Sequence, residues 1–153
     1  MADEMVSTVS VKLKEAYEFL ATFDKFPGAA PILLDEPPPL GEGHGPNAAA
    51  LVGAAVGNCL AASLLFCLRR SRVEVDALES KVTVRVARLD GGRLRIAGID
   101  VVIDPGLAPG HDPARFDRCK GLFEEFCTVT QSIRKGIPVE VSVGAASAGA
   151  DAG

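Results

Sequence analysis

Polar and apolar residues alternate near the start of the chain. Val9, Val11 and Leu13 are separated by polar residues, and the sequence AYEFLATF follows shortly afterwards. Alternation with a period of two is typical of strands that bury one face. We therefore expect a pair of strands at this end of the chain. The next segment, ILLDEPPPLGEGHGPN, is rich in proline and glycine and is expected to be a loop.

A long apolar run follows, from Pro46 to Leu68, and it contains no charged residue. Pro46 suits the first turn of a helix, where its missing N–H costs nothing. The run ends in a cluster of arginines, which complements the negative end of a helix dipole. The pattern predicts one long helix that extends to about Ser71 and is buried on all sides.

The same run is long enough to cross a bilayer, and its Gly53-x-x-x-Gly57 motif would favour dimerisation there. Its hydrophobicity is mild, however, because alanine and glycine dominate it, and it includes the polar residues Asn58 and Ser63. In water, small residues let other elements approach the helix closely. We therefore expect a core helix and no membrane partner.

The second half of the chain predicts a hairpin, a helix and a strand. Two alternating segments flank Asp90-Gly91-Gly92, a turn sequence typical of hairpins. A helix is expected between Pro113 and Gly136, with Cys119 and Cys127 facing inward, because apolar residues recur there at three- and four-residue spacing. Residues 137–143 alternate as a closing strand.

This order of strands, long helix, hairpin, helix and strand predicts an α+β fold. The chain has 153 residues, which suits a single domain, expected over residues 1–143. The small-residue tail, residues 144–153, is expected to be disordered.

Charge limits the partners. The net charge of −4 and the absence of a basic run argue against nucleic acid. All ten arginines lie at or after Arg69, so a function that needs an arginine must draw on the second half. The N-terminus has acidic residues and no apolar signal segment, so the expected location is the cytoplasm.

The four cysteines form two sets with the same spacing. Cys59 and Cys67 are eight residues apart, as are Cys119 and Cys127. Eight helical residues rise about 12 Å, whereas a disulfide needs Cα atoms within about 7 Å. Any disulfide must therefore link the two helices, for example Cys59 to Cys127. Cys67 and Cys119 are interpreted as small buried hydrophobic residues.

We expect no metal and no cofactor. The sequence has no close Cys/His grouping, and His44 and His111 lie alone in predicted loops.

Two cysteine blocks carry a resemblance. The block DEPPPLGEGHGPNAAALVGAAVGNCLAASLLFCLRRSRV, followed by FCTVTQSIRKGIPVEV, resembles the OsmC/Ohr family of osmotically inducible and organic hydroperoxide resistance proteins. The resemblance covers residues 35–143. It implies an intertwined α+β homodimer, with a long buried central helix packed with antiparallel sheets.

The resemblance also implies chemistry. Cys59 matches the cysteine that attacks an organic hydroperoxide, and Cys127 matches the one that resolves the resulting sulfenic acid as a disulfide. An external thiol would then reduce that disulfide. The chain departs from the family pattern at two places, because Ala49 replaces a glutamate and no arginine precedes Arg69.

An apolar helix raises the pKa of a thiol unless a cation lies beside it. His44, Lys25 and Arg134 are the candidates for that cation. The alternative function is a non-catalytic dimer of the same fold that binds an apolar small molecule at its interface.

Overall fold

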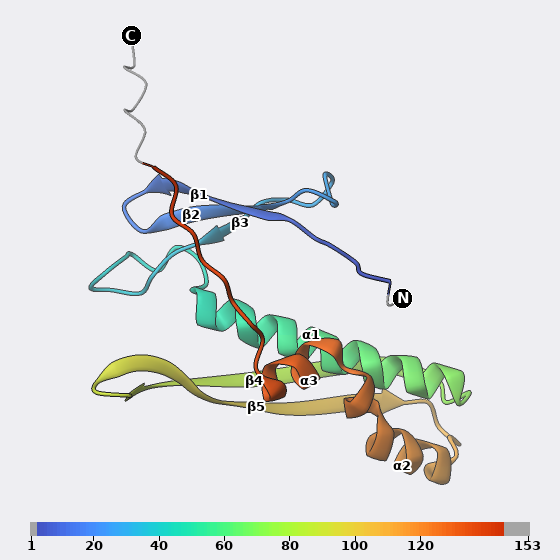
Figure 1. Cartoon of the computed structure of the whole chain (residues 1–153). Coiled ribbons are helices and arrows are strands. Elements are labelled where there is room, and N and C mark those ends of the chain that lie inside the picture. Colours follow the sequence, from blue (N-terminus) through green and yellow to red (C-terminus); the bar gives the residue numbers. More distant parts are fainter. Residues whose placement is uncertain (1–2, 146–153) are drawn as a thin grey trace.

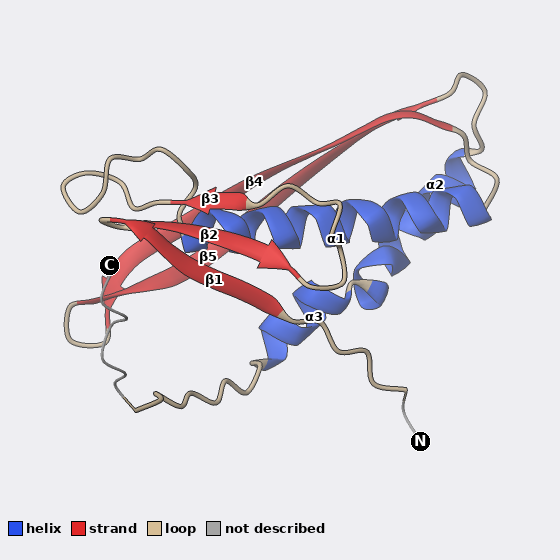
Figure 2. Cartoon of the chain, turned by 90° about the horizontal axis from the view of Figure 1, so that it is seen from above, coloured by secondary structure: helices blue, strands red, loops and turns tan. Residues whose placement is uncertain are grey.

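The computed structural model describes residues 3–145 and has the predicted α+β architecture (Figure 1). An N-terminal antiparallel sheet, a long helix and a long hairpin follow one another, and short helices come last (Figure 2). The elements are β1 (Val9–Glu15), β2 (Glu18–Phe23), β3 (Ile32–Leu34), α1 (Ala48–Arg70), β4 (Val75–Leu89), β5 (Arg93–Leu107), α2 (Pro113–Leu122), the 3-10 helix η1 (Phe123–Phe126) and α3 (Thr128–Lys135).

Helix α1 confirms the predicted helix, with clear signals at both ends. Asn47 caps it, because its side-chain oxygen accepts a hydrogen bond from the Ala50 N–H at 3.0 Å. Pro46 therefore precedes the cap and does not lie in the first turn, contrary to the prediction. At the other end, the Val73 N–H donates to the Leu68 carbonyl, and Arg72 has a φ of 58°. This is the Schellman arrangement, in which glycine usually occupies the left-handed position.

One face of α1 lies directly on the hairpin. A Cβ added to Gly53 would lie 2.5 Å from Val84, and one added to Gly57 would lie 2.6 Å from Val82. Glycine is required at both places, as the small-residue pattern predicted. The expectation of burial on all sides was wrong for the single chain, because only the face that contacts the hairpin and the C-terminal helices is covered. Its buried residues are Gly53, Val56, Gly57, Leu60, Leu64 and Leu68.

Helix α1 is also long and apolar enough to cross a membrane by length and composition alone. Its glycines, however, fit it closely against β4. It is the core helix of this fold.

The N-terminal sheet confirms the predicted strand pair and adds a strand. β2 pairs with β1 on one side and with β3 on the other, where Phe19 lies opposite Leu34. The prediction of a loop was therefore wrong over Ile32–Leu34. These three apolar residues form a strand that pairs with the free edge of β2. The sheet stands apart from the layer formed by α1 and the hairpin (Figure 1).

The predicted helix between Pro113 and Gly136 is divided into α2, η1 and α3. The break occurs because Cys127 has extended backbone angles and caps α3 with its sulfur, which accepts from the Thr130 N–H at 3.4 Å. A residue in that conformation cannot continue the preceding helix. Gly136 ends α3 as predicted, with a φ of 79°.

The closing strand over residues 137–143 was also wrong for the single chain. These residues belong to no sheet in the part of the chain that the structure describes, and Val139 and Val141 are 80% and 83% exposed. An isolated strand has no ladder partner for its backbone groups. Gly144 and Ala145 are irregular, and the rest of the predicted disordered tail lies outside the described residues.

Candidate functional site

Two cysteine pairs connect α1 to the C-terminal helices. Cys59 and Cys67 lie on α1, and Cys119 and Cys127 lie in α2 and at the cap of α3. Cys67 is bonded to Cys119, whereas Cys59 and Cys127 are free thiols. Helix α1 and the C-terminal helices run in opposite directions. Moving eight residues forward from Cys59 along α1 therefore corresponds to moving eight residues back from Cys127, which places Cys67 beside Cys119.

The free pair is a thiol–thiol contact at the N-terminus of α3. Cys59 packs against the buried cluster that contains the Cys127 sulfur. That sulfur lies 3.1 Å from Thr130 Oγ1 and 3.4 Å from the Thr130 nitrogen. Cys127 is fully buried in a cluster with Val56 and Leu60, whereas Cys59 is partly exposed.

The environment separates the acidities of the two thiols. Burial raises the pKa of Cys59, and the neighbouring Cys127 sulfur raises it further, while backbone N–H groups at the start of α3 act against this. Burial also opposes ionisation of Cys127. Hydrogen bonds from the Thr130 hydroxyl, the Cys59 thiol and the first amides of α3 outweigh that effect and lower the pKa of Cys127. Of the two thiols, Cys127 therefore ionises more readily.

The sequence offers three candidate cations for the Cys59 thiolate: His44, Lys25 and Arg134. His44 instead bonds Glu18 at 2.6 Å, and Arg134 bonds Glu124 at 2.8 Å. Lys25 lies in the turn after β2. Within residues 3–145, the groups that shift the pKa of Cys59 include none of these cations. Backbone amides of α3 act against the rise, but the pKa of Cys59 stays raised.

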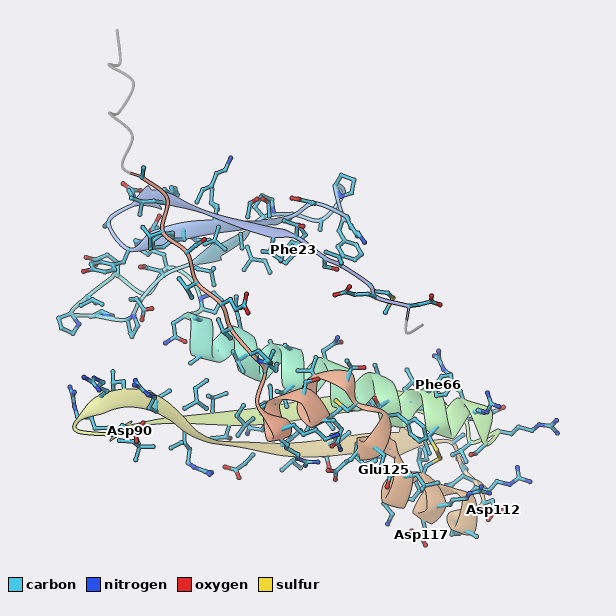
Figure 3. All side chains as sticks on the ribbon, viewed as in Figure 1. Phe23, Phe66, Asp90, Asp112, Asp117 and Glu125 are labelled. Carbon is cyan, nitrogen blue, oxygen red and sulfur yellow. A yellow bond between two sulfur atoms is a disulfide. The ribbon has the colours of Figure 1, made fainter. Side chains whose placement is uncertain are left out.

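The second pair corrects the sequence interpretation. Cys67 and Cys119 were taken as plain buried residues, but they form a disulfide with Cα atoms 5.7 Å apart. Figure 3 shows the sulfur–sulfur bond near Phe66, where the end of α1 adjoins α2. The equal spacing of eight residues could have predicted this disulfide, because two antiparallel helices that bring Cys59 close to Cys127 also bring Cys67 close to Cys119.

An apolar cavity of about 620 Å³ lies beside the free pair, between α1, β5 and the C-terminal helices. Leu60, Leu64, Ile99 and Phe123 line it. Neither free thiol lines it. Thr130 connects the cavity to the free thiols, because it lines the cavity and its hydroxyl contacts the Cys127 sulfur.

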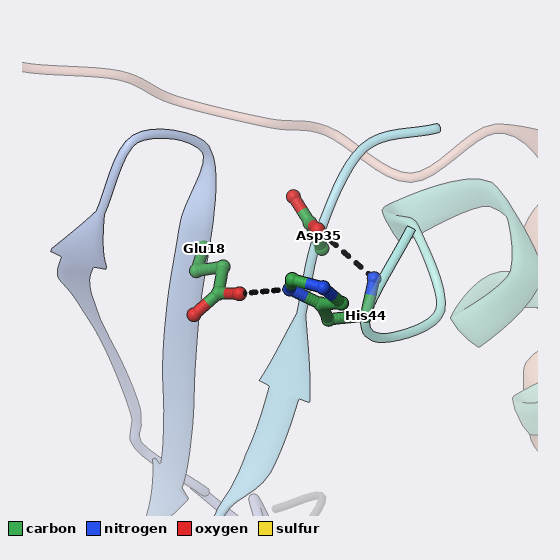
Figure 4. Close-up of side chains that lie close together, drawn as sticks. All are labelled: Glu18, Asp35 and His44. Atoms are coloured by element: carbon green, nitrogen blue, oxygen red, sulfur yellow. Dashed lines mark hydrogen bonds and ion pairs between the residues drawn. The ribbon is translucent and has the colours of Figure 1, made fainter. Parts of the chain in front are cut away.

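A cluster in the N-terminal sheet was missed by the sequence reasoning. Glu18, Asp35 and His44 each offer a ligand atom within 4.8 Å of the others, so His44 is not isolated (Figure 4). Asp35, however, accepts backbone N–H bonds from Glu36, Glu42 and His44. Glu18 is bonded to both Lys14 and His44. These bonds hold the loop before α1 against β2, a structural role.

Comparison with known structures supports the fold. An OsmC-like protein of unknown function from Vibrio cholerae aligns with a TM-score of 0.73 at 15% identity, covering 84% of this chain and 94% of that one. The organic hydroperoxide resistance protein OhrB of Bacillus subtilis aligns with a TM-score of 0.62 at 18% identity, covering 85% and 91%.

A third similar structure is an organic hydroperoxide resistance protein OsmC from Legionella pneumophila. It has a TM-score of 0.67 and 13% identity, and the alignment covers 87% of this chain and 92% of that one. No curated protein sequence matches the chain significantly.

The sequence model of the OsmC-like protein family matches residues 41–142, about two thirds of the chain. The matched region contains α1, the hairpin and all four cysteines. The family match and the fold agree with the resemblance that the two cysteine blocks predicted. The chain is a member of the OsmC-like protein family.

Proposed function

We propose that the protein is a thiol-dependent peroxidase that reduces organic hydroperoxides with Cys59 and Cys127. The observation that carries this proposal is that two free thiols, one partly exposed and one buried, pack together in one apolar cluster. Two similar structures are of organic hydroperoxide resistance proteins, which agrees with a redox role.

In the first step Cys59 is the nucleophile, because it is the accessible thiol of the pair. Its own proton must leave before it can attack, since the thiolate is the reactive form. The neighbouring Cys127, whose pKa is lowered, acts in its thiolate form as the base that takes this proton. This arrangement replaces the arginine of the family pattern.

The Cys59 thiolate then attacks the terminal, proton-bearing oxygen of the hydroperoxide. The O–O bond breaks, the alkoxide leaves with a proton as the alcohol, and Cys59 becomes a sulfenic acid. Cys127, again a thiolate, attacks the Cys59 sulfur. Hydroxide leaves as water once protonated, and a Cys59–Cys127 disulfide remains. An external thiol returns the pair to the reduced state.

The residues around the pair favour an apolar hydroperoxide. Val56, Leu60, Phe123 and Val129 pack against Cys59 and Cys127. An alkyl or aromatic group of the substrate gains free energy by burial against such side chains, whereas hydrogen peroxide has no such group.

We further propose that the functional unit is a homodimer. The N-terminal sheet stands apart from the core layer, and Val11 and Leu13 on β1 are exposed (Figure 1). The alternating valines of residues 137–143 lack a sheet partner in the single chain. A second copy would cover these apolar surfaces. Light scattering should therefore give twice the chain mass, and a stable monomer at micromolar concentration would contradict this.

A trapping experiment tests the peroxidase proposal. Cumene hydroperoxide is added to Cys127→Ser and to Cys59→Ser in the presence of dimedone, and the labelled residue is mapped by mass spectrometry. Dimedone should mark Cys59 in Cys127→Ser and mark nothing in Cys59→Ser. A mark on Cys127 in Cys59→Ser would reverse the two roles. No mark in either variant would remove the peroxidase function.

The second candidate function is binding of an apolar small molecule without catalysis. The cavity of about 620 Å³ favours it, because this cavity is largely apolar and excludes both free thiols. A fatty-acid probe that binds there with equal affinity before and after oxidation of the protein, combined with no peroxide consumption, would support this alternative.

A further inference from the structure

A second groove, of about 730 Å³, lies on the side of α1 where the disulfide is found. Four arginines line it, Arg70, Arg72, Arg115 and Arg118, and no acidic residue does. Phe66 and Phe126 supply apolar walls and are 62% and 68% exposed. The groove therefore combines positive charge with apolar surface.

In the described part of the chain, most of these arginines are not paired with an acidic residue. Arg115 pairs with Asp112 at 3.3 Å and donates to the Ser71 carbonyl. Over residues 3–145, the other three arginines form no ion pair. A concave surface with several unpaired guanidinium groups attracts anions.

Arg72 gives a separate indication of function. It occupies the left-handed position that ends α1, with a φ of 58°, where glycine would be free of strain. An arginine at this place costs stability, and its side chain lines the groove. A strained residue that contributes a charged side chain to a groove is a reason to look for a ligand.

The groove also leads to the disulfide. Cys67 lines it, whereas Cys119 is fully buried. An attacking sulfur can therefore reach Cys67 only. The Ser71 hydroxyl lies 3.5 Å from the Cys119 sulfur, where it can donate a hydrogen bond to a thiolate.

We propose that this groove binds small anionic thiols and directs them to Cys67, which makes the Cys67–Cys119 disulfide a second redox centre. The inference does not depend on the peroxidase proposal, because it concerns a different pair of sulfurs.

The exchange proceeds in two steps. The ligand thiolate attacks the Cys67 sulfur, a bond forms between the two, and the Cys67–Cys119 bond breaks with its electron pair on Cys119. The Ser71 hydroxyl stabilises that thiolate. A second thiolate then attacks the ligand sulfur and leaves with it as a small-molecule disulfide. Cys67 and Cys119 take up two protons from solvent, so two thiols have supplied two electrons.

The test uses three thiols of different charge on the full chain with Cys59→Ser, which removes the accessible free thiol. The probes are 2-mercaptoethanesulfonate, 2-mercaptoethanol and cysteamine, whose thiolate forms carry net charges of −2, −1 and 0. The rate of reduction of the Cys67–Cys119 disulfide is measured per thiolate. It should be fastest for 2-mercaptoethanesulfonate, by about tenfold over 2-mercaptoethanol, and the preference should shrink at high salt. The mixed disulfide should map to Cys67.

Variants separate charge from structure. Arg118→Gln should reduce the preference for the anionic thiol, and Arg72→Gly should do so while keeping or raising the melting temperature. Arg69→Gln is the matched control, because Arg69 lies on the same helix end but does not line the groove. It should leave the rates within about twofold.

Four results would overturn the inference. Free thiols at Cys67 and Cys119 in the untreated protein would remove the disulfide itself. Equal rates for the three thiols, equal losses in Arg69→Gln and Arg118→Gln, or a mixed disulfide on Cys119 would each remove the groove as the cause.

Discussion

Cys67 and Cys119 are bonded to each other, whereas Cys59 and Cys127, eight residues away on each side, remain thiols. Both pairs join α1 to the same C-terminal helical segment. They differ in what surrounds the sulfurs. Amide groups and the Thr130 hydroxyl stabilise an anion at Cys127, whereas the Ser71 hydroxyl alone contacts Cys119 among the side-chain hydrogen-bond partners within residues 3–145.

This difference shows that one fold can hold two cysteine pairs whose surroundings give them different roles. The closed pair fixes the end of α1 to α2 near the helix C-terminus, where the dipole disfavours a thiolate. The open pair lies at the start of α3, where the dipole favours one. Reactivity toward peroxide is therefore expected only at the open pair.

The largest expected effect comes from serine substitution in the two pairs. Cys59→Ser should reduce cumene hydroperoxide consumption to the uncatalysed rate, because the nucleophile is lost. Cys67→Ser, the matched control on the same helix, should retain turnover. Peroxide consumption by each variant in the presence of a thiol reductant checks this. Loss of turnover in both variants would show that the pairs do not act separately.

The next effect concerns stability. Cys67→Ala/Cys119→Ala removes a cross-link with a sequence separation of 52, and the free energy of unfolding should fall by about 2–4 kcal/mol. Cys59→Ala removes only packing and should cost about 1 kcal/mol. Urea denaturation without reductant measures both. Equal losses would mean that the cross-link does not constrain the unfolded chain.

The smallest effect is a shift in acidity. Thr130→Val keeps the side-chain shape but removes the hydroxyl 3.1 Å from the Cys127 sulfur, so the pKa of Cys127 should rise. The lowered pKa of Cys127 gives stability that is present above its ordinary value of 9.0 and is lost as pH falls through the folded value. In Thr130→Val the folded value lies nearer 9.0, so this contribution should be smaller and should be gone at a higher pH.

The thiolate absorbance of the reduced protein, followed from pH 5 to pH 10, measures this shift. Thr128→Val is the control, because Thr128 is exposed and its side chain makes no bond to Cys127. An unchanged titration in Thr130→Val would show that the backbone amides alone hold the charge.

Much of the fold could be predicted from local patterns. The uncharged run gave α1, and Asp90-Gly91-Gly92 gave the hairpin turn. The division of the second helix could not be predicted, since it depends on Cys127 acting as a cap instead of continuing the helical pattern. The strand expected over residues 137–143 requires a partner strand, which no local pattern supplies.

The sequence predicted one of the two cysteine pairs and missed the other. The resemblance pointed to Cys59 and Cys127, and both lie in one packed apolar cluster. The link between Cys67 and Cys119 was missed because each residue suits a buried apolar position when taken alone. The amide groups that bear on the two thiols arise from backbone geometry, which side-chain identities do not reveal.

Disulfide mapping by mass spectrometry, before and after one equivalent of cumene hydroperoxide, tests the central claim most directly. The account predicts a Cys67–Cys119 bond in both samples and a Cys59–Cys127 bond only in the treated one. A Cys59–Cys127 bond absent after treatment, or any bond between the two pairs, would contradict the division of the four cysteines into one closed and one reactive pair.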